Sequence, residues 1–295
     1  QGVSSAASDV YKRQVLKDLM GLESTAAGAI IGVVIAVIVG IIIIGGIKRI
    51  ATVTEKVVPF MALMYLLACL YIILSNFTFI DDAFRLIITE AFNPTAIGVG
   101  SVIGVLLVGF KRAAFSNEAG AGSASIAHSA VKTKYSASEG LVALLEPFID
   151  TVIVCTMTAL VLIITGYVDP SNASLNNADA ILLTSGAFES VISWFPYVLT
   201  IAVVLFAFST MISWSYYGFQ GWAYLFGRSK RMEYMYKLIF CFFVIIGSAA
   251  SLGSVIDFSD AMIFAMMVPN MVGIVILAPK AKKELQKYFS AIKQS

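Results

Sequence analysis

Two adjacent hydroxyl groups, those of Ser209 and Thr210, lie inside a long apolar run and could bind a cation. Hydroxyl and carbonyl oxygens are suitable ligands for hard cations. Alternatively, each hydroxyl donates to a backbone carbonyl one turn earlier, a common arrangement in apolar helices. Trp214 follows Thr210 by one helical turn on the same face. It either walls a small pocket or only packs, and the residues alone leave both alternatives open.

A second candidate is the glycine-rich run 95–110 with the polar stretch that follows it, KRAAFSNEAGAGSASIAHSA (residues 111–130). Glycines let the backbone leave the helix, which frees N–H and C=O groups to hold a small zwitterion or an ion. The alternative is close helix packing through small residues. Because the stretch also holds two bases, an amide and an acid (Lys111, Arg112, Asn117 and Glu118), the sequence favours function over packing.

A third candidate is the acid pair Glu146 and Asp150, spaced i,i+4 at the start of a later apolar run. Such residues share one helix face, and acids inside membrane segments are candidates for function. We expect a structural ion pair here instead, with Lys111 or Arg112 as the partner. Glu118 can share that pair.

Composition assigns the chain to the membrane class. Of its 295 residues, 59% are hydrophobic and 13% charged, and the mean hydropathy is +0.89, whereas soluble domains carry about 25% charged residues. The net charge of +2 argues against a nucleic-acid partner. Because hydrolase, zinc-protease and P-loop motifs do not occur, we predict no enzyme. We expect the three cysteines to be buried packing residues and His128 to serve local packing or hydrogen bonding.

The apolar runs predict an all-α membrane protein with about seven transmembrane helices, since a helix needs about 20 residues to cross a bilayer. The expected spans are residues 26–46, 57–76, 95–110, 140–166, 191–217, 238–252 and 261–277. The third is short and rich in glycine, the pattern of a broken helix that continues into residues 111–130. The seventh is expected to break near Pro269 and Asn270. Residues 77–94 are predicted to form an amphipathic helix at the membrane interface.

The basic residues predict the orientation. They gather in segments on one side of the predicted membrane, residues 48–56, 111–134, 228–237 and 280–293, while the opposite loops hold only Arg85. The basic side is cytoplasmic by the positive-inside rule. This predicts a multi-pass inner-membrane protein with a transmembrane domain over residues 15–280 and a basic cytoplasmic tail over residues 281–295. The N-terminus is then outside.

Residues 1–14, QGVSSAASDVYKRQ, do not match this pattern. They are polar and aperiodic, and their two basic residues fall on the non-cytoplasmic side. We interpret them as a non-native leader, which is excluded from fold reasoning, and expect the chain to lack its true start.

Residues 110–133, FKRAAFSNEAGAGSASIAHSAVKT, resemble the signature of the alanine or glycine:cation symporter family, a pattern close to KRG-x-FSNEAG-x-GSA-x-IAHAA. Residues 45–62, 146–161 and 206–218 agree with the same family. The resemblance covers residues 20–290. It implies the inverted-repeat fold of amino-acid:sodium symporters, in which two five-helix repeats have broken first and sixth helices. The chain would hold the last two helices of the first repeat and the whole second repeat, without helices one to three.

The resemblance also implies where substrate binds. In the family, substrate and cation lie between broken helix one, helix three, broken helix six and helix eight. Gly100, Ser101 and Val102 stand where the family usually has a Gly-Gly pair followed by an apolar residue. Ser101 departs from that pattern, which can favour a different amino acid. The polar stretch 111–130 then becomes a cytoplasmic gate region rather than a substrate site.

Helix eight of the family corresponds to the predicted span 191–217. The resemblance implies that the Ser209 and Thr210 hydroxyls and the Phe206 carbonyl hold a sodium ion. Thr210 and Trp214 would face the substrate. A residue that contacts both ligands would let each one bias the same conformational equilibrium, which coupling requires.

The sequence therefore predicts a secondary active transporter that couples inward sodium flow to uptake of a small neutral amino acid, alanine or glycine. Sodium is the coupling ion, the lipid bilayer is the surroundings, and no cofactor or nucleic-acid partner is expected. One alternative is a passive channel or facilitator. Another is that this truncated chain is a non-transporting fragment.

Overall fold

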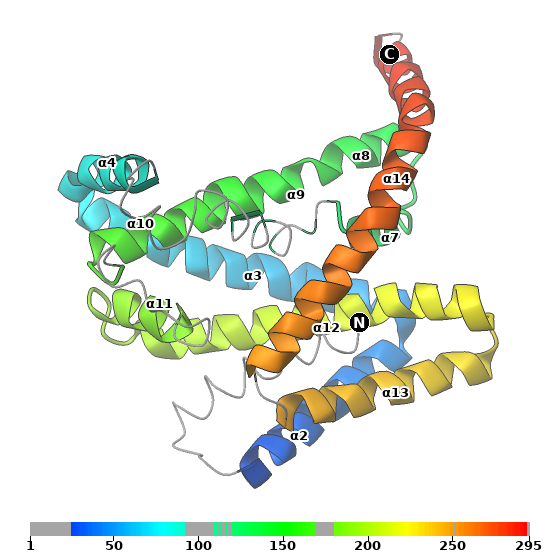
Figure 1. Cartoon of the computed structure of the whole chain (residues 1–295), viewed down its shortest axis with the longest axis horizontal. Coiled ribbons are helices and arrows are strands. Elements are labelled where there is room, and N and C mark those ends of the chain that lie inside the picture. Colours follow the sequence, from blue (N-terminus) through cyan, green and yellow to red (C-terminus); the bar gives the residue numbers. More distant parts are fainter. Residues whose placement is uncertain are drawn as a thin grey trace. The chain divides into compact units, whose positions relative to one another are not determined.

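The computed structural model describes residues 25–91, 109–110, 113, 116, 118, 120–168, 180–249 and 252–293. The regular elements within these ranges are all helices (Figure 1). Four of them are long and apolar enough to cross a membrane: Gly46–Ser75, Ser136–Ile164, Phe195–Phe226 and Val255–Lys293. A shorter apolar helix covers Gly32–Ile44. The prediction of an all-α membrane protein is confirmed.

The number of crossings and the inverted repeat stay predictions. Most of the expected third span, residues 95–110, lies outside the described residues, as do Gly100, Ser101 and Val102. The chain divides into two compact units, residues 1–93 with 157–259 and residues 94–156 with 260–295.

The first unit is built around α12 (Phe195–Phe226), which contacts α2 (Thr25–Ile44), α3 (Gly46–Ser75), α11 (Ala180–Glu189) and α13 (Lys230–Ala249). The 32 residues of α12 carry no charge. Pro196 lies in its first turn, where a missing N–H costs little, and Gly227 follows its last residue with a φ of 87°, a conformation that favours glycine. α10 (Thr156–Ile164) packs in the same unit.

Two buried clusters hold the first unit together. One joins the second half of α3 to α10, α11 and the start of α12, with Cys69, Val161 and Phe188 fully buried. The second joins α2 and α13 to the middle of α12 through Val39 and Met211. The second cluster thus fixes the middle of α12, the region that carries its hydroxyl residues, against α2 and α13.

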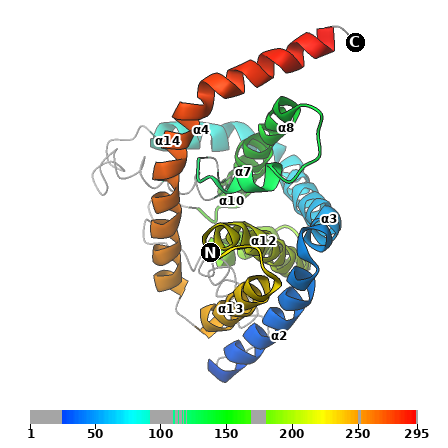
Figure 2. The same ribbon diagram turned by 90° about the vertical axis from the view of Figure 1, so that its right-hand side faces the viewer.

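Small residues allow α2 and α13 to approach closely, and both views show the two helices side by side (Figures 1 and 2). Gly32, Ala36 and Gly40 recur every four residues along α2, the spacing by which small residues bring membrane helices together. A Cβ added to Gly32 would lie 1.9 Å from the Ser248 hydroxyl oxygen. The Cys241 thiol lies 3.7 Å from the Ala36 carbonyl oxygen, to which it donates. This seam tolerates no larger side chain at Gly32.

Two expectations about local structure in the first unit are settled. The basic segment 48–56, expected between two spans, is helical and belongs to α3, so that only Gly45 separates α2 from α3. Lysine and arginine are good helix formers, and a basic run therefore does not require a loop. The expected amphipathic helix is confirmed as α4 (Ile80–Ala91) after a single 3-10 turn, Phe77–Phe79. Its position at the membrane interface stays a prediction.

The second unit contains α7 (Ser123–His128), α8 (Ser136–Ala143), α9 (Leu145–Pro147), the π-helical segment η2 (Phe148–Cys155) and most of α14 (Leu252–Lys293). α14 runs without interruption through Pro269 and Pro279 and includes most of the basic tail. The expected break near Pro269 is wrong, because apolar helices can absorb a proline through local adjustment.

One of the three cysteines differs from expectation. Cys69 is buried and Cys241 half-buried, but Cys155 is exposed. It lies in η2, none of whose residues is buried. The prediction of a buried packing role is therefore wrong for Cys155, because an apolar run predicts membrane-compatible surface and does not fix which side is covered by protein.

Candidate functional site

Three oxygen-bearing groups meet on one turn of α12, at the residues expected to bind a cation. The Ser209 hydroxyl donates to the Phe206 carbonyl at 2.8 Å, and the Thr210 hydroxyl donates to the same carbonyl at 3.0 Å. Ser209 is buried and Thr210 is half-buried. We call this group the α12 oxygen triad. All three residues lie on one regular helix, and cation binding by them stays a prediction.

The alternative considered from the sequence, that each hydroxyl donates to a carbonyl of its own helix, is also observed in the triad. We call this arrangement back-bonding. Donation to the i−3 or i−4 carbonyl uses the proton of each hydroxyl. A hydroxyl oxygen still has lone pairs after it donates, so back-bonding leaves the Ser209 and Thr210 oxygens able to accept. For the two hydroxyl oxygens the alternatives are therefore compatible, whereas the Phe206 carbonyl accepts both of their hydrogen bonds.

Trp214 is 4% exposed and lies one turn beyond Thr210 on α12. Its ring meets that of Tyr217 edge to face, with 5.8 Å between the centroids, a favourable geometry for aromatic pairs. These contacts are those of a packing residue. A role for Trp214 as the wall of a substrate pocket stays a prediction, as does any contact with Gly100, Ser101 and Val102.

A cavity of about 270 Å³ opens further along the first unit, where α2, α3, α12 and α13 meet. Its polar lining includes Ser215, Gln220 and Arg228, together with the ion pair of Lys237 and Glu233. The buried Lys237 ammonium also donates to the last carbonyl of α2, that of Ile44, at 3.4 Å. Cations near a helix C-terminus are stabilising, so this lysine caps α2. The α12 oxygen triad does not line the cavity.

The polar stretch 111–130 contains a tight turn that α14 holds in place. Gly120 and Gly122 have φ values of 87° and 95°, which favour glycine because it lacks a Cβ. The side-chain amide of Asn270 donates to the Gly120 carbonyl at 2.8 Å. The Ser123 hydroxyl, which is buried, donates to the Glu118 carboxylate. The turn before α7 is therefore fixed by hydrogen bonds on both sides.

The contact of Asn270 with the polar stretch 111–130 was not predicted from the sequence. The sequence did contain a signal, because an amide inside an apolar run needs a hydrogen-bond partner at membrane depth. The partner itself, 150 residues away, could not be read from the sequence.

We expect Gly122→Ala to lower the stability of the turn. The φ of 95° is strained for alanine, and the added Cβ would lie 3.1 Å from the Asn270 Cγ and Oδ1 atoms, so the cost is about 1–3 kcal/mol. Thermal unfolding of the purified chain in detergent measures it. Gly140→Ala in α8 is the matched control, since a Cβ there meets nothing within 4 Å. An equal loss in both variants would contradict this account.

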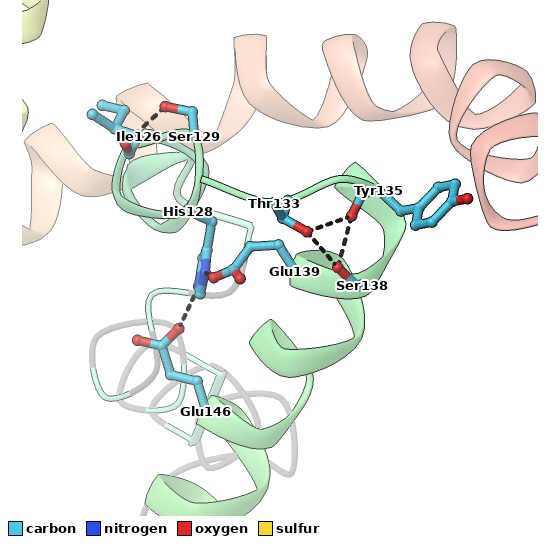
Figure 3. A network of polar contacts seen from close by, with 8 residues as sticks. All are labelled: Ile126, His128, Ser129, Thr133, Tyr135, Ser138, Glu139 and Glu146. Atoms are coloured by element: carbon cyan, nitrogen blue, oxygen red, sulfur yellow. Dashed lines mark hydrogen bonds and ion pairs between the residues drawn. The ribbon is translucent and has the colours of Figure 1, made fainter. Parts of the chain in front are cut away.

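A histidine lies between two carboxylates where α7, α8 and α9 approach one another (Figure 3). The His128 Nδ1 atom is 2.8 Å from a Glu139 oxygen, and Nε2 is 3.5 Å from a Glu146 oxygen. The hydrogen bond with Glu139 raises the pKa of His128, desolvation opposes that rise, and Glu146 adds to it. His128 lies outside the four helices long enough to span a membrane. Its expected local hydrogen-bonding role is confirmed.

Glu139 was not singled out from the sequence, because its position depends on the loop between α7 and α8. The Thr133 and Ser138 hydroxyls are 2.8 Å apart, and the Ser138 hydroxyl donates to the Tyr135 carbonyl at 2.7 Å (Figure 3). These bonds start α8 at Ser136 and bring Glu139 to the imidazole. Nothing in the residue pattern indicates that turn.

The acids Glu146 and Asp150 have different partners. Glu146 contacts His128, whereas Asp150 accepts from the Ser116 hydroxyl and, at 3.3 Å, from the Thr151 hydroxyl. The helix becomes π-helical from Phe148 onward, with i→i+5 hydrogen bonds, so that Asp150 lies in a segment of different backbone geometry from Glu146. Lys111 and Arg112 lie outside the described residues, so ion pairs with them stay predictions.

Comparison with known proteins gives a match to the family model described as the sodium:alanine symporter family, over residues 5–295. The chain is 39% identical over 268 residues to the sodium/alanine symporter AgcS of Methanococcus maripaludis, covering 90% of this chain and 58% of that protein. It is 31% identical to the amino-acid carrier protein AlsT of Bacillus subtilis, covering 90% of this chain and 56% of AlsT. It is 30% identical to the sodium/proton-dependent alanine carrier protein of Bacillus sp. PS3, covering 89% and 62%. The chain thus spans less than two thirds of the length of these relatives.

Proposed function

The chain belongs to the sodium:alanine symporter family, and from this premise we propose that the full-length protein couples inward sodium flow to uptake of alanine or glycine. This makes it a secondary active transporter, which moves substrate without covalent chemistry. The relatives support the proposal through their names, which include a sodium/alanine symporter and an amino-acid carrier. The long apolar helices fit a multi-pass membrane protein.

The α12 oxygen triad is the observation that carries the sodium part of the proposal. The Phe206 carbonyl and the Ser209 and Thr210 hydroxyls converge on one turn of a charge-free helix. Neutral oxygens suit a hard monovalent cation, and their own back-bonding keeps them in place. We propose sodium as the coupling ion and these three groups as part of its coordination.

The substrate part of the proposal joins Thr210 to a second segment. Thr210 and Trp214 would face the amino acid from α12, and Gly100, Ser101 and Val102 would approach it through backbone groups. Thr210 would then contact both ligands. A shared contact gives each ligand different affinities for two conformations, which is the condition for coupling.

The membrane location follows the same premise. The bilayer is the surroundings of the apolar helices, and we propose the cytoplasmic membrane with a cytoplasmic C-terminus. The last helix, α14, ends in a lysine-rich segment over residues 280–293, and excess lysine and arginine mark the cytoplasmic side.

The test is uptake of labelled alanine and glycine by the full-length protein in proteoliposomes. We expect concentrative uptake under an inward sodium gradient and none when potassium replaces sodium. Equilibration in both salts would indicate a passive channel or facilitator and would refute symport. A third arm imposes a proton gradient without sodium, because one relative is named a sodium/proton-dependent carrier. Uptake in that arm alone would replace sodium by a proton as the coupling ion.

A further inference from the structure

The contacts of His128 call for one more proton than a neutral imidazole carries. A neutral imidazole has one donor and one acceptor nitrogen. Here both ring nitrogens face carboxylate oxygens, Nδ1 at 2.8 Å from Glu139 and Nε2 at 3.5 Å from Glu146 (Figure 3). In either neutral tautomer, one nitrogen lone pair would face an ionised carboxylate. An additional proton removes that conflict, whether it resides on the imidazole or is shared with a carboxylate.

We propose that His128, Glu139 and Glu146 form a proton-binding site whose proton joins α7 to α8 and α9. The ligand is a single proton taken from the aqueous phase. With it bound, imidazolium donates to both carboxylates; without it, one of the two contacts becomes a repulsion between lone pairs. The net charge of the three groups changes from −1 to −2 when the proton leaves, so the two acids also lose the cation that separates them.

Among the residues that the structure describes, the two acids are the main charged influences on the imidazole. Glu139 comes from α8 and Glu146 from α9, and both raise the His128 pKa. In the connecting loop, Lys132 and Lys134 are exposed, and the Lys134 ammonium lies over the Tyr135 ring at 5.4 Å. α14 meets the turn before α7 through Met267, Asn270 and Met271, which do not titrate, and its Tyr288 ring contacts the Tyr135 ring of the connecting loop. Glu118 accepts from Ser123 at the other end of α7.

Burial shows which contact dominates. The side chains of His128 and Glu139 are 26% and 18% exposed, whereas that of Glu146 is 52% exposed. An ion pair in partly buried surroundings is less screened than an exposed one. The Glu139 contact is also the shorter one. We therefore expect Glu139 to hold most of the binding free energy of the proton and Glu146 to add a smaller part.

The sign of the pH effect follows from linkage. The pKa of His128 is raised above its ordinary value of 6.5, so the folded state binds the proton more tightly than the unfolded segment does. The stabilisation of α7 against α8 is therefore complete below about pH 6.5 and is lost as pH rises through the raised pKa. The segment 123–135 is expected to open more readily at alkaline pH.

The first test is an NMR titration of the imidazole in the purified chain in nanodiscs. The sequence contains one histidine, so a histidine-free purification tag leaves a single signal. We expect a pKa above about 6.5, a lower one in Glu139→Gln and a smaller decrease in Glu146→Gln. Glu284→Gln is the matched control, because Glu284 pairs with Lys287 on α14 and should leave the titration unchanged. An ordinary pKa, or no response to either glutamine variant, overturns the proposal.

The second test is hydrogen exchange of segment 123–135 between about pH 5 and about pH 8, corrected for the intrinsic rate with an unstructured peptide. When this segment opens, the bound proton is released, so the proton stabilises the closed segment at low pH. Between low and high pH, protection against exchange should therefore fall about tenfold for each pH unit by which the His128 pKa exceeds its ordinary value. Glu139→Gln should flatten this dependence and Glu284→Gln should not. A pH-independent protection in the unchanged chain contradicts the proposal, even where the imidazole titrates as expected.

These outcomes do not depend on the proposed transport function. Both measurements use the chain itself and follow a proton, with no uptake assay. A protein that fails to transport alanine but shows the raised and acid-dependent titration would refute the proposed function and leave the proton site in place. A protein that transports alanine but shows an ordinary His128 pKa would refute the proton site and leave the proposed function in place.

Discussion

A full-length protein carrying Thr210→Ala is expected to lose sodium-dependent alanine uptake by about tenfold or more while remaining folded in the membrane. The substitution removes one of the three oxygens of the α12 oxygen triad and the proposed contact with substrate. Its hydroxyl bond is an additional i→i−4 bond of 3.0 Å to the Phe206 carbonyl, so the helix itself keeps its backbone bonds. A binding loss of about 1.4 kcal/mol is enough for a tenfold effect. Uptake in proteoliposomes, normalised to the amount of protein inserted, measures it.

Thr200→Ala is the matched control for this prediction. Thr200 lies on the same helix, and its hydroxyl donates to the Pro196 carbonyl at 2.8 Å in the same i→i−4 manner, but it has no part in the triad. We expect it to transport normally. Thr210→Ser, which keeps the oxygen and removes a methyl group, should retain most of the uptake. Normal uptake by Thr210→Ala would remove Thr210 from both proposed binding roles.

Replacing Gly32 with leucine is expected to separate α2 from α13 and to destabilise the first unit. An added Cβ would lie 1.9 Å from the Ser248 hydroxyl oxygen and 2.8 Å from the Ser248 Cβ, and Ser248 is fully buried. The hydroxyl alone could rotate, but the Cβ position moves only with the α13 backbone. Overpacking of a tight core costs about 1–3 kcal/mol or more. The measurement is the thermal unfolding midpoint of the purified chain in detergent.

Gly221→Leu is the control for the effect of placing a leucine on a helix of the first unit without a steric clash. Gly221 lies on α12 in the same unit, and a Cβ there meets nothing within 4 Å, so we expect little change. A second variant checks the atom responsible, because Gly32→Ala combined with Ser248→Gly removes both close contacts and should recover stability that Gly32→Ala alone loses. A Gly32→Leu chain as stable as the Gly221→Leu chain would show that the α2–α13 seam can open without cost.

Local sequence properties determined the class, the helical elements and the family of this protein. The length of the apolar runs indicated membrane helices, because the bilayer sets that length for any helix. The stretch around FSNEAG indicated the family. The α12 oxygen triad was also predictable, because Phe206, Ser209 and Thr210 lie within five residues on one helix and the helical repeat alone places them together.

The local errors have a common physical cause. Helix-forming lysines continued α3 where a loop was expected, α14 passed through Pro269, and the helix beyond Glu146 became π-helical. In each case the pattern of residues permits more than one backbone conformation. Packing and hydrogen bonding around the segment then select one of them, and neither is encoded in a short window of sequence.

The contacts between distant segments were decided by tertiary structure alone. Asn270 reaches the Gly120 carbonyl across 150 residues, and Lys237 caps α2 from a helix 193 residues later. His128 acquires Glu139 only because the turn at Thr133 to Ser138 folds α8 back toward α7. Residue types indicate which groups need partners, because a polar group away from water is costly when left unpaired. Which partner each group receives depends on how whole helices pack, and that is set by the sum of many contacts along the chain.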